Sequence, residues 1–128
     1  MDKPGKFLAS SIVRVLQVDD ENNNWSPLEK LLNEIDPTIQ INHITNPDDV
    51  LNLIEKETFN CIVTDYKLNG MNGLQLASKI REKSQIPIIL YTGQSEESIA
   101  ERAFLIGIDD YIRKEDKPSH YQLLIKRN

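Results

Sequence analysis

Five short runs of apolar, largely β-branched residues recur along the chain and predict five β-strands. They cover residues 12–18, 38–44, 61–64, 86–91 and 110–113. The first, third and fourth runs are nearly continuous, which is typical of strands covered on both faces of a parallel sheet. The second run alternates Ile39, Ile41 and His43 with polar residues, as an edge strand does. We therefore expect a parallel sheet with this strand at a solvated edge.

The segments between these runs carry apolar residues at helical spacing and predict five helices. Their apolar faces are formed by Trp25, Leu28, Leu32 and Ile35; by Val50, Leu53 and Ile54; by Leu74, Ala77 and Ile80; by Ile99, Ala103 and Phe104; and by Tyr121, Leu124 and Ile125. The second helix has clear start signals in Asn46 and Pro47, and the fourth ends at Gly107, which suits a left-handed cap. The start of the first helix is open, because Pro27 fits its first turn while Ser26 fits a later cap.

Strand and helix alternate at a regular interval. The strands begin at residues 12, 39, 61, 86 and 110, so 22 to 27 residues separate one start from the next. Parallel strands need helical crossovers of about this length, and right-handed crossovers place helices on both faces of the sheet. The pattern therefore predicts one domain over residues 1–128, with its core at about 12–125, built as a doubly wound α/β sandwich.

The composition of the chain argues against several classes of function. The chain has 128 residues, a formal net charge of −5 and a pI near 5.0, which argues against binding to nucleic acid or an anionic membrane. The single cysteine, Cys61, excludes an internal disulfide and a multi-cysteine metal site, and it reads as a buried strand thiol. No apolar segment approaches a membrane span or a signal peptide, so we expect a cytoplasmic protein.

Chemistry-bearing side chains follow the predicted strands at the points where they end. Asp19 and Asp20 follow the first strand, Asp65 the third, Thr92 the fourth and Lys114 the fifth. Each one alone has an ordinary explanation, such as a helix-start acid, a turn residue or a solvated charge. Because ligands of open α/β sheets bind beyond the carboxyl ends of the strands, the four strand ends together predict one site.

The residue types at this rim suit phosphoryl chemistry. Clustered carboxylates repel one another unless a hard cation such as Mg²⁺ lies among them, and Asp19, Asp20 and Asp65 supply its preferred oxygen ligands. A carboxylate can act as nucleophile toward a phosphoryl group, while Thr92 and Lys114 hold the transferring oxygens. The chain has no glycine-rich ATP-binding loop, so the phosphoryl donor is expected to be another molecule.

These residues resemble the receiver domain of two-component response regulators, over about 12–125. The resemblance implies a flavodoxin-like (βα)5 fold with strand order 2-1-3-4-5, and Mg²⁺ bound by the acidic pair of Val-Leu-Gln-Val-Asp-Asp-Glu, Asp19 and Asp20. The phosphorylated aspartate would be Asp65, in Cys-Ile-Val-Thr-Asp-Tyr-Lys-Leu-Asn-Gly-Met-Asn-Gly, with the carbonyl of Lys67 completing the metal site. The hydroxyl residue would be Thr92, in Pro-Ile-Ile-Leu-Tyr-Thr-Gly.

The remaining parts of the family's site also have counterparts. The conserved lysine would be Lys114, in Asp-Asp-Tyr-Ile-Arg-Lys, and the aromatic switch residue would be Tyr111. The chain departs from the family pattern where receivers commonly have prolines, since it has Glu115 after the lysine and Asn69 in the loop after the acceptor.

The resemblance implies a phosphorylation-dependent switch. A sensor histidine kinase or phosphotransfer protein would phosphorylate Asp65, Thr92 and Tyr111 would turn inward, and the face formed by the fourth helix, the fifth strand and the fifth helix would change. That face would bind a downstream output protein or domain, or a second copy of the chain as a homodimer. We expect no direct contact with nucleic acid or membrane and no free-standing enzyme activity, apart from self-dephosphorylation. The chain would be a single-domain receiver or a receiver piece of a longer regulator or hybrid kinase.

Several other readings compete with this one. The nearest is a receiver-like module that binds partners without being phosphorylated. A haloacid dehalogenase-type phosphatase would need a second aspartate at the position of Lys67, and a flavodoxin-like FMN site would be repelled by the acidic residues after the first strand. A phosphohistidine relay through His43 or His120 is less favoured, because both positions suit ordinary surface histidines.

Overall fold

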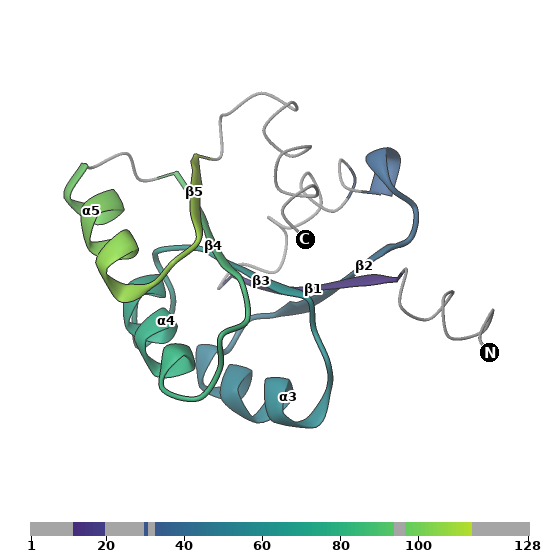
Figure 1. The fold of residues 1–128 in the computed structure, drawn as a ribbon, viewed down its shortest axis with the longest axis horizontal. Helices are drawn as coiled ribbons and strands as arrows, with labels where there is room; N and C mark the ends of the chain where they lie inside the picture. The colour runs from purple at the N-terminus through teal and green to yellow at the C-terminus, as the bar shows by residue number, and fades with distance from the viewer. Residues whose placement is uncertain (1–11, 20–29, 31–32, 94–96, 114–128) are drawn as a thin grey trace.

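The computed structural model describes residues 12–19, 30, 33–93 and 97–113. Its elements, drawn in Figure 1, are β1 (Val13–Val18), β2 (Ile39–Ile44), the 3₁₀ turn η1 (Pro47–Asp49), α3 (Val50–Lys56), β3 (Cys61–Thr64), α4 (Gly73–Arg81), β4 (Ile88–Thr92), α5 (Glu97–Ile106) and β5 (Asp110–Arg113). Four of the five strands match the predicted runs to within one residue at each end. Of the predicted first helix, the described residues 30 and 33–35 are helical, and the predicted fifth helix lies outside the described residues.

The five strands form one parallel sheet in the order β2-β1-β3-β4-β5, which confirms the expected topology. Val18 of β1 pairs with Ile44 of β2 and with Thr64 of β3, and Thr64 pairs with Leu90 of β4. Strand β2 lies at an edge, as its alternating pattern predicts. Because all strands run in the same direction, their carboxyl ends lie along one rim of the sheet.

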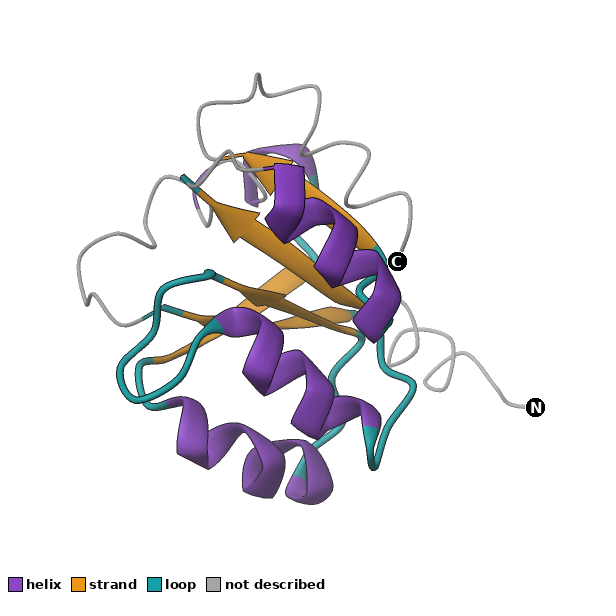
Figure 2. Cartoon of the chain, turned by 90° about the vertical axis from the view of Figure 1, so that its left-hand side faces the viewer, coloured by secondary structure: helices purple, strands orange, loops and turns teal. Residues whose placement is uncertain are grey.

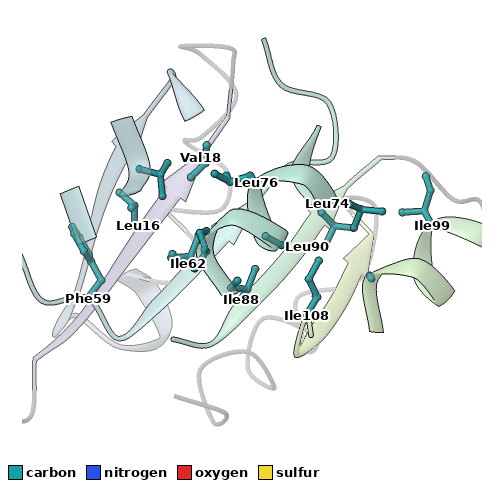
Figure 3. Close-up of a cluster of buried hydrophobic side chains, with 14 residues drawn as sticks. Leu16, Val18, Phe59, Ile62, Leu74, Leu76, Ile88, Leu90, Ile99 and Ile108 are labelled. Carbon is teal, nitrogen blue, oxygen red and sulfur yellow. The ribbon is translucent and has the colours of Figure 1, made fainter. Parts of the chain in front are cut away.

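One face of the sheet is covered by α3, α4 and α5, which lie on the same side of the strands (Figure 1). In the view turned by 90°, two of the helices lie below the strands and the third crosses in front of them (Figure 2). The core on this face is made mainly of Leu, Ile and Val side chains from the strands and helices, and most of them are fully buried. Figure 3 shows this cluster, with Leu16, Ile62 and Leu90 of the sheet and Leu74 and Leu76 of α4 among its members.

The opposite face of the sheet has its own apolar cluster. It includes Val15, Val63, Ile89 and Ile112 from four neighbouring strands, and each of these side chains is at most 5% exposed. Cys61 belongs to the same cluster and is buried, as predicted. In the part of the chain that the structure describes, no helix is long and apolar enough to span a bilayer.

Helix starts and ends follow the expected local signals, with one difference. The side chain of Asn46 accepts a hydrogen bond from the N–H of Asp48 and caps the turn, but the chain first forms the short 3₁₀ turn η1 before α3 begins at Val50. Gly107 has a φ of +108°, so it ends α5 in the left-handed conformation that glycine adopts at low cost.

Strand β4 begins two residues later than its apolar run predicts. The N–H of Ile86 donates to the Ser84 hydroxyl, and its carbonyl accepts from the Arg81 guanidinium at 2.7 Å. Both backbone groups of Ile86 are therefore engaged outside the sheet, and Pro87 has no N–H to give to a strand ladder. The strand starts at Ile88 for this reason.

Candidate functional site at the carboxyl rim of the sheet

Asp19 and Asp65 lie side by side at the ends of neighbouring strands. They directly follow Val18 and Thr64, which are partners in the β1–β3 register. The backbone N–H of Asp19 donates to Ile44 (3.1 Å) and that of Asp65 donates to Val18 (3.0 Å), so the sheet ladder holds both residues. Asp19 is only 3% exposed, and Asp65 is half-buried. The structure therefore places these two residues next to each other at the rim, and their role in one site stays a prediction.

Two carboxylate residues at adjacent strand ends form a donor set suited to a hard cation. Carboxylate oxygens are the ligands that a hard cation such as Mg²⁺ prefers. Within residues 12–19, 30, 33–93 and 97–113, no group of three His, Cys, Asp or Glu residues is close enough to hold a metal. The third expected carboxylate, Asp20, lies outside those ranges.

The loop that follows Asp65 is closed on itself by hydrogen bonds. The Thr64 hydroxyl donates to the Asp65 carbonyl at 3.0 Å, and the N–H of Tyr66 donates to Asp65 Oδ1 at 2.7 Å. Further along, Lys67 forms an isolated antiparallel bridge with Asn72. The backbone of Lys67, whose carbonyl the resemblance assigns to the metal site, is therefore held in a compact loop while its side chain is exposed.

The same loop is locked against the start of α4. Asn72 caps the helix, because its side chain accepts from the N–H of Gln75 while the Gln75 side chain accepts from the N–H of Asn72, both at 2.8 Å. The N–H of Gly73 donates to the Tyr66 carbonyl at 2.6 Å. An ideal Cβ at Gly73 would lie 2.3 Å from the Asp65 carbonyl oxygen, so only glycine lets the helix pack this closely on the candidate acceptor.

The remaining predicted residues are placed as far as the structure describes them. Thr92 is the last residue of β4 and pairs with Arg113 of β5, so its backbone lies at the carboxyl rim, while its side chain is outside the described part. Tyr111 lies beside Leu90 in the β4–β5 register and packs, partly buried, against the core under α4 and α5. Lys114 is outside the described residues.

The structure places one of the two histidines considered as alternatives. His43 lies on the edge strand β2 opposite Gln17 of β1, and it is half-buried rather than fully at the surface. His120 lies outside the described residues. An open groove of about 520 Å³, lined by residues 54–60 and 84–87, lies at the opposite rim, because both segments precede strands β3 and β4.

Parallel order β2-β1-β3-β4-β5 and paired acids at the carboxyl rim define the class: a flavodoxin-like α/β domain with an acidic site. The sequence-family model of the response regulator receiver domain matches residues 15–126, so the chain belongs to this family. The expected family is thereby confirmed.

Individual relatives agree with the family match. The heme response regulator HssR of Staphylococcus aureus (strain Newman) is 36% identical over 108 residues, which cover 80% of this chain and 45% of HssR. The transcriptional regulatory protein SrrA of S. aureus (strain NCTC 8325 / PS 47) is 34% identical over 112 residues, 88% of this chain and 46% of SrrA. The chain thus spans less than half the length of these two curated relatives.

A solved structure supports the same fold. The CheY-like response regulator receiver domain protein from Methanospirillum hungatei JF-1 is 26% identical and superposes with a TM-score of 0.78. The superposition covers 91% of this chain and 92% of that one.

Sequence reasoning missed three residues that shape this site. Gly73 carries no functional group and draws no interpretation from the sequence pattern, yet it sets how closely α4 approaches Asp65. Tyr66 was passed over, although its N–H holds an Asp65 oxygen. Arg102 of α5 reaches the Tyr66 hydroxyl, at 3.5 Å, from a helix distant in sequence. The motif Asn-Gly-Met-Asn-Gly is a signal for the first of these, whereas no sequence pattern indicates the contact between Tyr66 and Arg102.

Proposed function

We propose that this chain accepts a phosphoryl group on Asp65 from a phosphohistidine of a sensor kinase or phosphotransfer protein. The observation that carries the proposal is the half-buried Asp65 carboxyl beside the buried Asp19 at adjacent strand ends, in a member of the receiver family. A carboxylate oxygen of Asp65 attacks phosphorus, the new O–P bond forms, and the N–P bond of the donor breaks. The imidazole leaves with the electron pair and takes up a proton.

The proposed metal ligands are the carboxylates of Asp19, Asp20 and Asp65 and the carbonyl of Lys67. When bound there, Mg²⁺ neutralises charge on the transferring oxygens. Support comes from the placement of the buried Asp19 beside Asp65 at adjacent strand ends, which puts two carboxylates of the type that Mg²⁺ prefers at one point of the rim. The loop bridge between Lys67 and Asn72 keeps the proposed carbonyl ligand in one backbone conformation.

The proposed output of the switch is a change in the face formed by α5, β5 and the C-terminal segment after β5. Thr92 and Lys114 would hold phosphoryl oxygens, and Tyr111 would move with Thr92. In support, α5 exposes two large apolar side chains, Phe104 at 60% and Leu105 at 86%, as a partner-binding helix does. To raise the active population from about 1% to about 99%, phosphorylation must favour the active state by roughly 5.5 kcal/mol.

The proposed context is a cytoplasmic two-component system. The partner of the switching face would be an output protein or domain or a second copy of the chain, and the chain would act as a receiver with self-dephosphorylation rather than as a free-standing enzyme. HssR and SrrA, which are named as a heme response regulator and a transcriptional regulatory protein, are about twice as long as the matched segment, in keeping with a receiver joined to an output part.

Intact mass after incubation with a small phosphoryl donor, with and without Mg²⁺, tests the proposal. We expect an adduct of one phosphoryl group on the wild type in Mg²⁺ and none on Asp65→Asn. Asp48→Asn, which alters an exposed aspartate in the turn before α3, is the matched control and should still form the adduct. Absence of the adduct on wild type in excess Mg²⁺ would instead favour the phosphorylation-independent binding module.

A further inference from the structure

A polar contact joins the loop of the candidate acceptor to helix α5. Arg102 Nη2 lies 3.5 Å from the hydroxyl oxygen of Tyr66, the residue directly after Asp65. The Arg102 side chain is also turned along its own helix, since its Nε donates to the Ser98 carbonyl at 3.4 Å. The two residues are 36 positions apart in sequence, so the contact exists only because the fold brings the β3–α4 loop and α5 together.

The backbone of Tyr66 contacts Asp65, and its side-chain hydroxyl contacts α5. Its N–H donates to Asp65 Oδ1 at 2.7 Å, and its carbonyl accepts from Gly73 at 2.6 Å. Its ring packs, partly buried, against the core on the helical side of the sheet. A change in the hydrogen bonding of the Asp65 carboxyl therefore acts on a residue whose far end meets Arg102.

The side chains of helix α5 are buried along one narrow face and exposed elsewhere. Two of its side chains, Ile99 and Ala103, are at most 1% exposed, while Phe104 and Leu105 face solvent. Its C-terminal end is held at Gly107, whose carbonyl accepts from the Arg81 guanidinium at 3.0 Å. A helix with a narrow buried stripe shifts at lower cost than one packed on several sides, so a single polar contact along its length can alter its preferred position.

We infer that Tyr66 and Arg102 are a pair of positioning residues that hold α5 against the acceptor loop and make its position depend on the state of Asp65. The inference deepens the proposed function and rests on it for the phosphorylation step. A phosphoryl group on Asp65 adds strong acceptor oxygens beside the Tyr66 N–H. Because the contact of Tyr66 with Arg102 is long and at the surface, it is readily exchanged when that neighbourhood changes.

Amide hydrogen exchange of the full chain, followed by mass spectrometry, tests this inference. We expect Tyr66→Phe to raise exchange in α5 about two- to threefold before any phosphoryl mimic is added, with α4 unchanged. Arg102→Met should give the same increase, whereas Arg102→Gln, which keeps an N–H donor, should restore part of the protection. Glu101→Gln, an equally exposed neighbour on α5, is the control and should leave exchange unchanged.

Beryllium fluoride with Mg²⁺ serves as the phosphoryl mimic in the second arm. In wild type it should change α5 exchange, and in Tyr66→Phe that change should be at least twofold smaller. Equal α5 exchange in wild type and Tyr66→Phe in the first arm, or a rise spread equally over α4 and α5, overturns the inference. If the mimic has no effect on wild type while Tyr66→Phe still loosens α5, the proposed function fails and the positioning role stands.

Discussion

The tight contact between Gly73 and Asp65 allows a quantitative prediction. An alanine Cβ at position 73 would lie 2.3 Å from the Asp65 carbonyl oxygen and 3.0 Å from Leu90 Cδ1. Cβ contacts below 3.0 Å essentially do not occur, so helix α4 and the acceptor loop must separate by at least 0.7 Å, the difference between 3.0 and 2.3 Å. The obstacle is backbone, which cannot rotate away as a flexible side chain can.

Both stability and phosphorylation are expected to suffer in Gly73→Ala. Overpacking of this kind costs about 1–3 kcal/mol, and the better helix propensity of alanine offsets at most about 1 kcal/mol. A net loss of about 1–2 kcal/mol lowers Tm by roughly 3–10 °C in a domain of this size. Because a misplacement of about 1 Å can slow a reaction by about a hundredfold, we expect phosphorylation of Asp65 to slow by at least about tenfold.

Thermal unfolding and the rate of adduct formation with a small phosphoryl donor measure the two effects. The rates are compared at a temperature where circular dichroism shows both proteins folded. Gly93→Ala is the control for stability, since a Cβ there meets no atom within 4 Å. A Gly73→Ala protein with wild-type Tm and wild-type rate would refute the argument that this glycine sets the position of Asp65.

Three further predictions concern the hydrogen bonds of Arg81, the proposed metal site and the turn before β2. Arg81→Met removes hydrogen bonds to three carbonyls and an ion pair, from a side chain 14% exposed, and should lower the unfolding free energy in urea by about 2–4 kcal/mol. Mg²⁺ at about 100 times its Kd should stabilise the wild type by about 2.7 kcal/mol in thermal unfolding, and Asp19→Asn should lose most of that gain. Hydrogen bonds from the Thr38 hydroxyl and then its N–H lower the pKa of Asp36. Asp36 therefore contributes stability above its unfolded pKa, and this contribution is lost as pH falls through the lower folded value, so Thr38→Val should move the Asp36 pKa upward in an NMR titration.

The fold was largely predictable because the burial of a strand determines its pattern of apolar and polar residues. A strand covered on both faces, such as Cys61–Thr64, is continuously apolar, and the edge strand Ile39–Ile44 alternates. The prediction placed the start of β4 two residues too early, for a reason that the apolar pattern does not contain. Ile86 is apolar enough for a strand, but Arg81 and Ser84 capture its backbone groups.

The candidate site was predictable only where strand ends define it. Asp19 and Asp65 could be placed together because parallel strands end at one rim, and the register confirms their adjacency. The contact between Tyr66 and Arg102 could not, because it depends on the position of α5 across the sheet and on side-chain direction. Such contacts between surface residues distant in sequence follow from tertiary packing, for which one sequence carries no periodic signal.

The strand order explains why the site lies at Asp19 and Asp65 rather than elsewhere on the rim. After β1 the chain moves outward to β2 at the edge, and it then returns to place β3 on the other side of β1. Connections from neighbouring strands diverge where the order reverses in this way, and the divergence leaves a crevice at their carboxyl ends. Asp19 and Asp65 end the two strands that flank this point. The loop after Asp65 is held to α4 by Gly73 and to α5 through Tyr66 and Arg102. The proposed phosphoryl and Mg²⁺ site therefore lies next to a loop that contacts both α4 and α5.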